Sequence, residues 1–460
     1  MWAWRGFTFE SRIFAVAYGQ EPFPLPGGYG PWRFKPMKIL HTGSWCLGGR
    51  FYGHSRRAEH LHFLEWLLGA LREFQPDALF VTGSVFSSPV PSAEAEAMLG
   101  EFLLRAVSEV EGLQVVLLGG ACDTGARLEA CSALWKLHNV YVRSTVHRLP
   151  SGQPAFEEHL LPLSRRGSEE AVCVCRALPL LRGGDYPAGL PFEAGLRFWF
   201  ENLRKALQKS PFKGLPVVTA ASFGAVPSGV GGVARFEPSV SLGSDAELVD
   251  LVGREVCFTA LSRVGEGMGL GCEGRLSLAG SPLPQDFEEA RGAFGANLVE
   301  ISEESGEVEA RSLAYTPLRG LETIPSQGFA ASPSEVLEAF GALRDRVSGD
   351  DESQFPFLEV RVRGWQAEPD FRSELLRLSE LKAVSLCRVR GVSAGEPGRE
   401  VRGSSNSGTE RGGGKARKSP LRLALEDFRT RFGSEMPQAL VERFKKAADE
   451  AACSTEAYED

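Results

Sequence analysis

"MKILHTGSWCLGG", residues 37–49, joins a short apolar run to a glycine-rich loop. The run has the length and composition of a buried strand, and the glycines mark the loop that follows it. In open α/β folds, the loops at the carboxyl ends of strands carry the functional groups. Such loops usually present a carboxylate or an imidazole, whereas this one presents Ser44, Trp45 and Cys46. The loop is therefore placed like a catalytic loop but lacks the side chains of one.

Strands and helices alternate after this loop. Apolar residues recur at helical spacing and predict helices at 56–74, 92–110 and 124–137. Short apolar runs that end in glycine-containing loops predict strands at 77–84 and 113–123. This βαβαβ order predicts an α/β fold, a sheet covered by helices. The loops at the ends of the strands should meet at one rim, and they span residues 43–49, 83–88 and 119–123.

The residue composition and the predicted secondary structure change toward both ends of the chain. Residues 1–36 are rich in aromatic residues, Gly and Pro, lack a signal-peptide pattern, and are interpreted as a flexible or mis-assigned leader. Residues 291–392 combine a predicted hairpin with alternating helices and strands, as in a small α+β domain. A Gly/Ser/charge tract at 393–418 predicts a disordered linker. Beyond it, 419–453 predict two short amphipathic helices.

Composition narrows the class of protein. The chain has 460 residues, 43% of them apolar and 24% charged, which is typical of a soluble multidomain protein. Its net charge of −8 gives no global field that would attract DNA. Nine cysteines without framework spacing predict a reduced, cytoplasmic location. All seven histidines precede residue 160, so any mechanism that needs later imidazoles is excluded.

A series of segments resembles, in order and spacing, the motifs of the SbcD/Mre11 family of nucleases. They are "MKILHTGSWCLG", "PDALFVTGSVFSSPVPSAEA", "GGACDTGARL", "CRALPLLRGGD", "VVTAAS", "VCFTALSR" and "AGSPLPQDFEEA". The strongest matches are "PDALFVTGSVF" and "SPLP", and the order of all seven makes the resemblance specific. The resemblance covers residues 37–290 well and continues more weakly to 392 and in the C-terminal helices. It implies a calcineurin-like metallophosphoesterase domain at 37–290, a capping domain at 291–392 and two Mn²⁺ ions that activate water for phosphodiester cleavage. It also implies an SbcC/Rad50-like SMC-family ATPase as partner.

The chain departs from the family at the positions that the resemblance assigns to the metal ligands and the catalytic imidazole. Other residue types stand there, and we identify these degenerate positions as Ser44, Cys46, Ser84, Ala121, Cys122, Ala221, Ala260 and Ser262. Asp123 alone keeps the residue type of its motif. We therefore expect no catalytic residue, no metal ligand and no cofactor. We also expect the degenerate side chains to surround one cavity at the rim.

Two alternatives concern the residues that remain. Cys46 and Cys122, with Asp123, offer thiolates and a carboxylate that Zn²⁺ accepts, although the facing loops supply no further ligand. Cysteine is equally common as a small buried hydrophobe, and this interpretation is preferred. Asp123 precedes the predicted helix at 124–137 and is interpreted as its N-cap. His41 lies in the strand itself and is interpreted as a core residue rather than a ligand.

Three functions are weighed. The preferred hypothesis is a catalytically inactive SbcD-like scaffold that binds an SbcC-like ATPase, and DNA, as a homodimer within a heterotetramer. The alternatives are an active Mn²⁺-dependent DNA exonuclease or endonuclease and a decayed paralogue without a partner. The apolar stripes of the C-terminal helices favour a partner-binding segment. Its predicted contact residues are Leu421, Leu425, Phe428, Phe432, Met436, Leu440 and Phe444.

Overall fold

The computed structural model describes most of the chain between residues 36 and 392. The described residues are 36–227, 239–242, 245–263, 268–271, 274–290, 292–302, 307–364 and 370–392, with Pro437, Gln438, Leu440, Val441 and Arg443. The predicted leader, apart from Pro36, and the predicted linker lie outside these residues. So do all of the predicted partner-contact residues except Leu440, which is exposed.

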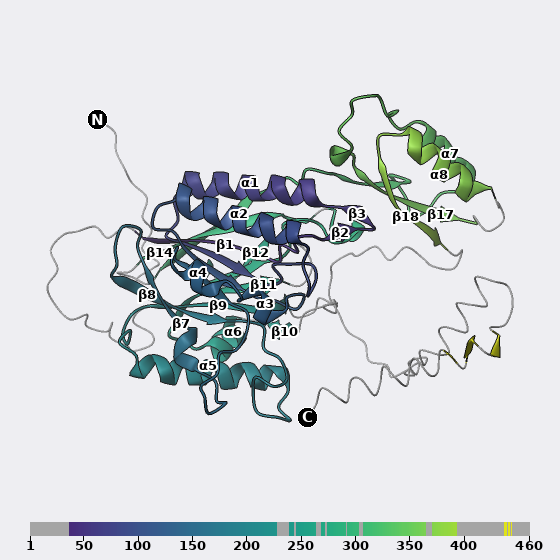
Figure 1. Cartoon of the computed structure of the whole chain (residues 1–460). Helices are drawn as coiled ribbons and strands as arrows, with labels where there is room; N and C mark the ends of the chain where they lie inside the picture. The colour runs from purple at the N-terminus through teal and green to yellow at the C-terminus, as the bar shows by residue number, and fades with distance from the viewer. Residues whose placement is uncertain are drawn as a thin grey trace, which may run out of the picture. The chain divides into compact units, whose positions relative to one another are not determined.

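A six-stranded sheet contains the opening strand of the sequence (Figure 1). Its order is β15-β14-β1-β4-β5-β6. The parallel part consists of β1 (Met37–Gly43), β4 (Ala78–Thr82), β5 (Gln114–Leu118) and β6 (Val140–Arg143). Every residue of β4 and β5 is buried, as expected of a parallel strand covered on both faces. The α/β prediction is confirmed for this region.

A second, seven-stranded sheet has the order β12-β13-β11-β9-β8-β7, with β10 paired to β9. Parallel pairs join its centre, between β8 and β9, β9 and β11, and β11 and β13. The strands are β7 (Leu160–Ser164), β8 (Ala171–Leu178), β9 (Val217–Pro227), β10 (Ser239–Leu242), β11 (Val256–Arg263), β12 (Met268–Gly271) and β13 (Leu276–Ala279). The sequence predicted β9, β11 and β13 at nearly these positions.

The two sheets pack face to face between two layers of helices. Ile39, Phe80 and Val116 of the first sheet share a buried cluster with Cys175 and Phe258 of the second. The outer face of the first sheet is covered by α1 (Arg57–Phe74) and α2 (Ala93–Glu109), and that of the second by α5 (Phe192–Lys209) and α6 (Asp245–Val252). Shorter elements are β2 (Arg50–Phe51), β3 (His54–Ser55), α3 (Gly125–Leu128), α4 (Ser132–Lys136), η2 (Phe156–His159) and η4 (Phe287–Glu289).

One predicted boundary is wrong. The hairpin assigned to the start of the α+β domain, β14 (Gly295–Ile301) and β15 (Val308–Ala314), belongs to the six-stranded sheet. β14 pairs antiparallel with β1. Without β14, the buried strand β1 would be an edge with unpaired backbone groups, which a closed core does not tolerate. The first domain therefore extends to Ala314 rather than to residue 290.

The remaining described elements form a separate α+β unit, residues 321–392. Its three parallel strands are β16 (Leu321–Ile324), β17 (Phe357–Arg363) and β18 (Ser385–Val392), and its helices are α7 (Pro333–Gly341), α8 (Phe371–Leu381) and η5 (Glu352–Gln354). A capping box of Ser332 and Glu335 starts α7. Phe51 and Phe287 pack on Phe357 and join the unit to the first domain. No helix in the described part of the chain is long and apolar enough to cross a bilayer.

Gly43, the last residue of β1, lies at a close approach of the two sheets. A Cβ at this position would stand 2.4 Å from the carbonyl oxygen of Thr82 and 2.9 Å from that of Ala279. Both neighbours are backbone atoms of buried strands and have no room to move away. Gly43→Ala should therefore lower the free energy of unfolding by about 1–3 kcal/mol, measured by urea denaturation.

The matched control is Gly69→Ala in α1, where an added Cβ meets no atom within 4 Å. This change should raise the free energy of unfolding by about 0.5–1 kcal/mol, because alanine restricts the unfolded chain more than glycine does. Equal effects of the two substitutions would contradict the close approach of the sheets at Gly43.

Candidate functional site

The loops after β1, β4 and β5 meet at one rim, as the sequence predicted. The amide of Ser44 donates to the carbonyl of Thr82 at 2.8 Å, and the amide of Cys46 donates to that of Ser84 at 3.1 Å. The amide of Cys122 donates to the hydroxyl oxygen of Ser84 at 3.1 Å. Ser84 therefore links the first and third loops. Four of the predicted degenerate positions, Ser44, Cys46, Ser84 and Cys122, therefore lie close together.

Burial of Trp45 stabilises the unusual backbone conformation of the two residues beside it, Ser44 and Cys46. Ser44 and Cys46 have φ angles of 46° and 51°, in the left-handed region. This conformation costs about 1–2 kcal/mol for each residue that is not glycine. Trp45 between them is fully buried, packs edge-on against Phe102 and Phe63, and donates its indole N–H to the hydroxyl of Thr42 at 3.2 Å. Burial of this side chain offsets the strain.

The second sheet closes the other side of the rim. The amide of Gly83 donates to the hydroxyl oxygen of Ser222 in β9 at 2.9 Å. A Cβ at Gly83 would stand 2.5 Å from Oγ of Ser44 and 3.1 Å from Cβ of Ser262 in β11. Its φ of 85° also favours glycine. Gly83 therefore lets loops of both sheets converge.

Three of the eight predicted rim positions lie outside the cluster. Ala221 packs beneath α5 and α6 in the outer core of the second sheet, and its neighbour Ser222 faces the rim instead. Successive residues of a strand face opposite sides, so an error of one position reverses the side chain. Ala260 lies deeper, in the core between the two sheets. Of the eight, Ser44, Cys46, Ser84, Cys122 and Ser262 lie close together at the rim. Ala121 instead lines a neighbouring cavity.

The carboxylate of Asp123 organises the rim rather than a helix. One oxygen accepts the amides of Val85 at 3.0 Å and Gly120 at 2.9 Å, and the other accepts the amide of Phe86 at 2.9 Å. The N-cap of α3 is Thr124, so the prediction that Asp123 caps the helix is wrong. The sequence alone shows the helix start but not the orphan amides of the β4 loop, which are contributed from 38 residues away.

His41 lies beneath the rim and is engaged on both ring nitrogens. Nδ1 is 2.6 Å from the hydroxyl of Ser277, and Nε2 is 2.9 Å from that of Thr82. The side-chain amide of Asn297 donates to the same Ser277 hydroxyl oxygen at 2.8 Å. This buried polar chain joins the two sheets. It agrees with the interpretation of His41 as a core residue.

The donors at the rim do not fit a pair of hard divalent cations. Such ions require several carboxylate, amide or imidazole ligands. The described residues that converge here offer hydroxyls and thiols, while both carboxylate oxygens of Asp123 accept amides. Within the described residues, no group of three or more His, Cys, Asp or Glu is arranged to hold a metal ion. The same arrangement leaves the zinc alternative of Cys46, Cys122 and Asp123 without support.

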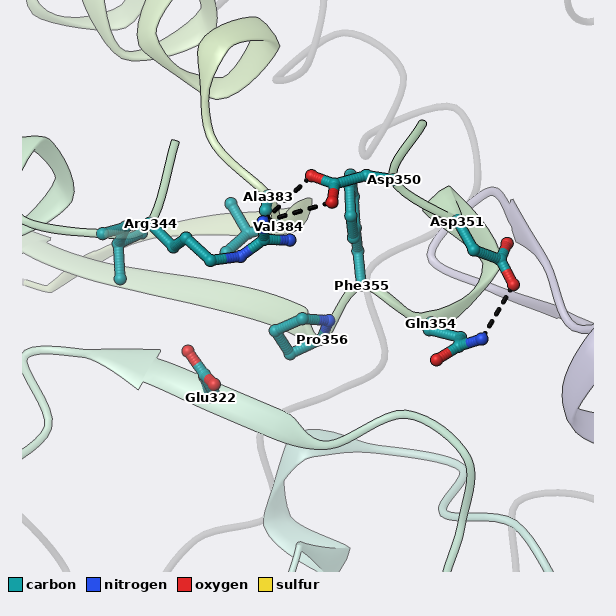
Figure 2. Close-up of a pocket in the computed structure, with 10 residues that line it drawn as sticks. Glu322, Arg344, Asp350, Asp351, Gln354, Phe355, Pro356, Ala383 and Val384 are labelled. Carbon is teal, nitrogen blue, oxygen red and sulfur yellow. Dashed lines mark hydrogen bonds and ion pairs between the residues drawn. The ribbon is translucent and has the colours of Figure 1, made fainter. Parts of the chain in front are cut away.

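Two cavities are not lined by the convergent serines. One of about 340 Å³ is lined by Ala121 with Arg182, Tyr186 and Phe192. The other, of about 440 Å³, belongs to the 321–392 unit (Figure 2).

The acidic residues of the larger cavity are partly engaged. Asp350 forms an ion pair with Arg344 at 3.0 Å, and Asp351 accepts from Gln354 at 2.9 Å. Figure 2 shows Glu322 across from them, on β16. We find no acid–base pair of catalytic type among these described residues.

No family model matches the chain. A curated protein of Rhodobacter capsulatus, named as the D subunit of the nuclease SbcCD, is 30% identical over 377 residues, which cover 78% of this chain and 88% of the relative. Its namesake from Escherichia coli K12 is 25% identical over 370 residues, 77% of this chain and 85% of the relative. Another from Bacillus subtilis is 33% identical over 106 residues, 23% of this chain and 27% of the relative.

Solved structures give weaker matches. The protein TT1561 of Thermus thermophilus has 12% identity and a TM-score of 0.34, covering 60% of this chain and 99% of its own. GAP50, described as the anchor in the inner membrane complex of Plasmodium, has 10% identity and a TM-score of 0.33, covering 62% and 90%. With scores this low, assignment to a family depends on the sequence relatives.

Burial lowers the pKa of His41 to about 3, whereas a histidine in the unfolded chain titrates near 6.5. Between these pH values the unfolded chain binds a proton that the folded chain does not. The free energy of unfolding should therefore fall below pH 6.5, by about 1.4 kcal/mol per pH unit for this histidine. His41→Gln should lose stability at pH 7 but show a shallower decline between pH 7 and pH 5, measured by urea denaturation.

His138→Gln is the control, because His138 is exposed. This variant should keep the wild-type dependence on pH. Burial also lowers the pKa of His60 to about 3 and that of His159 to about 4, so some decline remains in His41→Gln. Identical slopes for wild type and His41→Gln would contradict a neutral, buried His41.

Proposed function

The chain belongs to the family of the SbcCD nuclease's D subunit, and from this premise we propose that it is a D-type subunit without nuclease activity. Its role is to act as a scaffold for an SbcC-like ATPase partner, with DNA as a further ligand. The observation that carries the proposal is the composition of the rim. Ser44, Cys46, Ser84, Cys122 and Ser262 converge where the family resemblance places ligands of two metal ions.

The chemistry of phosphodiester cleavage supports this interpretation. Two cations a few ångströms apart are needed to activate water and to take up charge on the phosphate oxygens. Neutral hydroxyls hold Mn²⁺ poorly, and thiolates prefer softer metals. Asp123 could contribute a carboxylate only by releasing the amides of Val85, Phe86 and Gly120. The rim keeps its shape because these contacts do not depend on a metal.

The two alternatives are less well supported. An active nuclease would need its metal ligands from elsewhere in the chain, and His41, the histidine nearest the rim loop in sequence, is engaged on both nitrogens. A decayed paralogue would have no reason to retain an ordered rim around Ser84 or apolar stripes in the C-terminal segment. We therefore favour a scaffold whose function is to bind its partner.

The partner-binding part of the proposal concerns residues 419–453. Leu421, Leu425, Phe428 and Phe432 recur at helical spacing and predict one apolar stripe. Full burial of each such side chain contributes about 1.5–3 kcal/mol. Met436, Leu440 and Phe444 predict a second stripe. Burial of both stripes against a coiled coil would offset the entropic cost of ordering the segment. The tract 393–418 would act as a tether that raises the local concentration of the helices.

The purified chain should not degrade linear duplex DNA in Mn²⁺, and Mn²⁺ should not raise its melting temperature beyond the effect of Mg²⁺. The physical reason is the lack of hard ligands at the rim. Nuclease gels and differential scanning fluorimetry measure the two effects. The Escherichia coli relative, assayed in parallel, checks the conditions.

Ser84→Ala and Cys122→Ala separate a weak genuine activity from a contaminant. Mn²⁺-dependent degradation that either substitution abolishes would overturn the proposed inactivity. Degradation that persists unchanged in both variants would instead belong to a contaminating nuclease.

Phe428→Glu combined with Phe444→Glu should abolish co-purification with the SbcC-like ATPase, because two charges would enter the predicted apolar contact. Circular dichroism should show the remainder of the chain folded. Thr430→Glu with Gln438→Glu adds the same charge at polar positions and should leave binding intact. Wild-type recovery of the ATPase by the double phenylalanine variant would remove the main support for a scaffold.

A further inference from the structure

The three-stranded sheet of the 321–392 unit ends at β18. The strand order is β16-β17-β18, and among the described residues no strand pairs with the outer edge of β18. The carbonyl oxygen of Leu386, near the start of β18, lies 3.1 Å from Nε2 of His54, so the edge in question is residues 388–392. Every second residue of an edge strand directs its N–H and C=O outward, which makes such an edge a template for another strand. β18 is eight residues long, and Val389 in its middle is 38% exposed. The strand also carries Arg388 and Arg390, and an uncovered edge of this length can pair with another chain.

Helix α8 lies next to β18, and residues of both elements line one groove. Phe371 and Leu375 are buried in the core that α7 and α8 form over the sheet. Leu376, the next residue, is 51% exposed. A groove of about 260 Å³ lies between the helix and the strand, lined by Leu375, Leu376, Leu386 and Val389 (Figure 1 shows α8 beside β18). Leu376 therefore offers an exposed apolar side chain that an additional strand beside β18 could contact.

The positive charge of the groove indicates which kind of ligand would bind there. Among the described residues, its charged lining consists of Arg372 and Arg388, without an acidic residue. Arg388 is already paired with Glu359. The guanidinium of Arg372 has no hydrogen bond or ion pair with any described residue. An occupant that carries a carboxylate opposite Arg372 would therefore be complementary.

We propose that the groove between α8 and the outer edge of β18 binds an extended peptide segment of another protein as a fourth strand. The backbone of the segment pairs with β18, an apolar side chain covers Leu376, and a carboxylate bonds to Arg372. A helix would leave the strand edge unpaired, so the geometry favours an extended chain. Alternate side chains of the peptide would face α8, because residues of a strand alternate between two faces.

The probe is a display library of short linear peptides, panned against the full chain. Enriched peptides should alternate apolar and polar residues and include Asp or Glu. Synthetic copies, measured by fluorescence anisotropy, should bind Leu376→Lys about tenfold more weakly than wild type. Leu134→Lys, at an exposed leucine of α4, is the matched control and should bind normally. Hydrogen exchange should slow in residues 388–392 when peptide is present.

Arg372→Ala tests the charge. This substitution should weaken the binding of peptides that contain Asp or Glu but not the binding of their Asn or Gln counterparts. Added salt should weaken the binding of the acidic peptides to the wild-type chain in the same way. The proposal is overturned if no peptide is enriched or if enriched peptides bind Leu376→Lys normally. It is also overturned if the chain dimerises through this edge, seen as a dimer in light scattering that Leu376→Lys converts to a monomer.

Discussion

The close approach of two sheets at Gly43 is the constraint on which the rest of the first domain depends. Backbone oxygens from both sheets stand where a side chain of residue 43 would begin. The chain must therefore leave β1 without a side chain and turn at once into the rim loop. Trp45 anchors that turn in the core, and Gly83 allows the loop of β4 to reach between Ser44 and Ser262.

The architecture of the rim is maintained by contacts among protein groups. Ser84 connects the loops of β1 and β5, and Asp123 holds the amides of the β4 loop. Beneath them, His41 joins hydroxyls of both sheets. Each of these contacts satisfies a buried polar group that would otherwise cost free energy. A rim built in this way is held by contacts that need no metal ion.

The carboxylate of Asp123 has a structural role at the rim. A carboxylate that accepts three amide N–H groups is difficult to replace, because any shorter or neutral side chain leaves buried donors unpaired. Ser44 and Cys46, by contrast, bond to the neighbouring loop through their backbone amides. Their side chains can change without loss of those hydrogen bonds. Asp123 and the two loop residues thus differ in what the fold requires of their side chains.

The sequence by itself determined the α/β class, the positions of β1, β4, β5, α1 and α2, the convergence of three loops, and the family. These features follow from local periodicity and from ordered motifs, which a linear chain displays directly. Tertiary structure alone decided that Ser222 rather than Ala221 faces the rim, that Asp123 binds distant amides, and that the hairpin 295–314 completes the first sheet. The reason is physical: the face of a strand, the partner of an edge and the amides that need an acceptor depend on residues far apart in the chain.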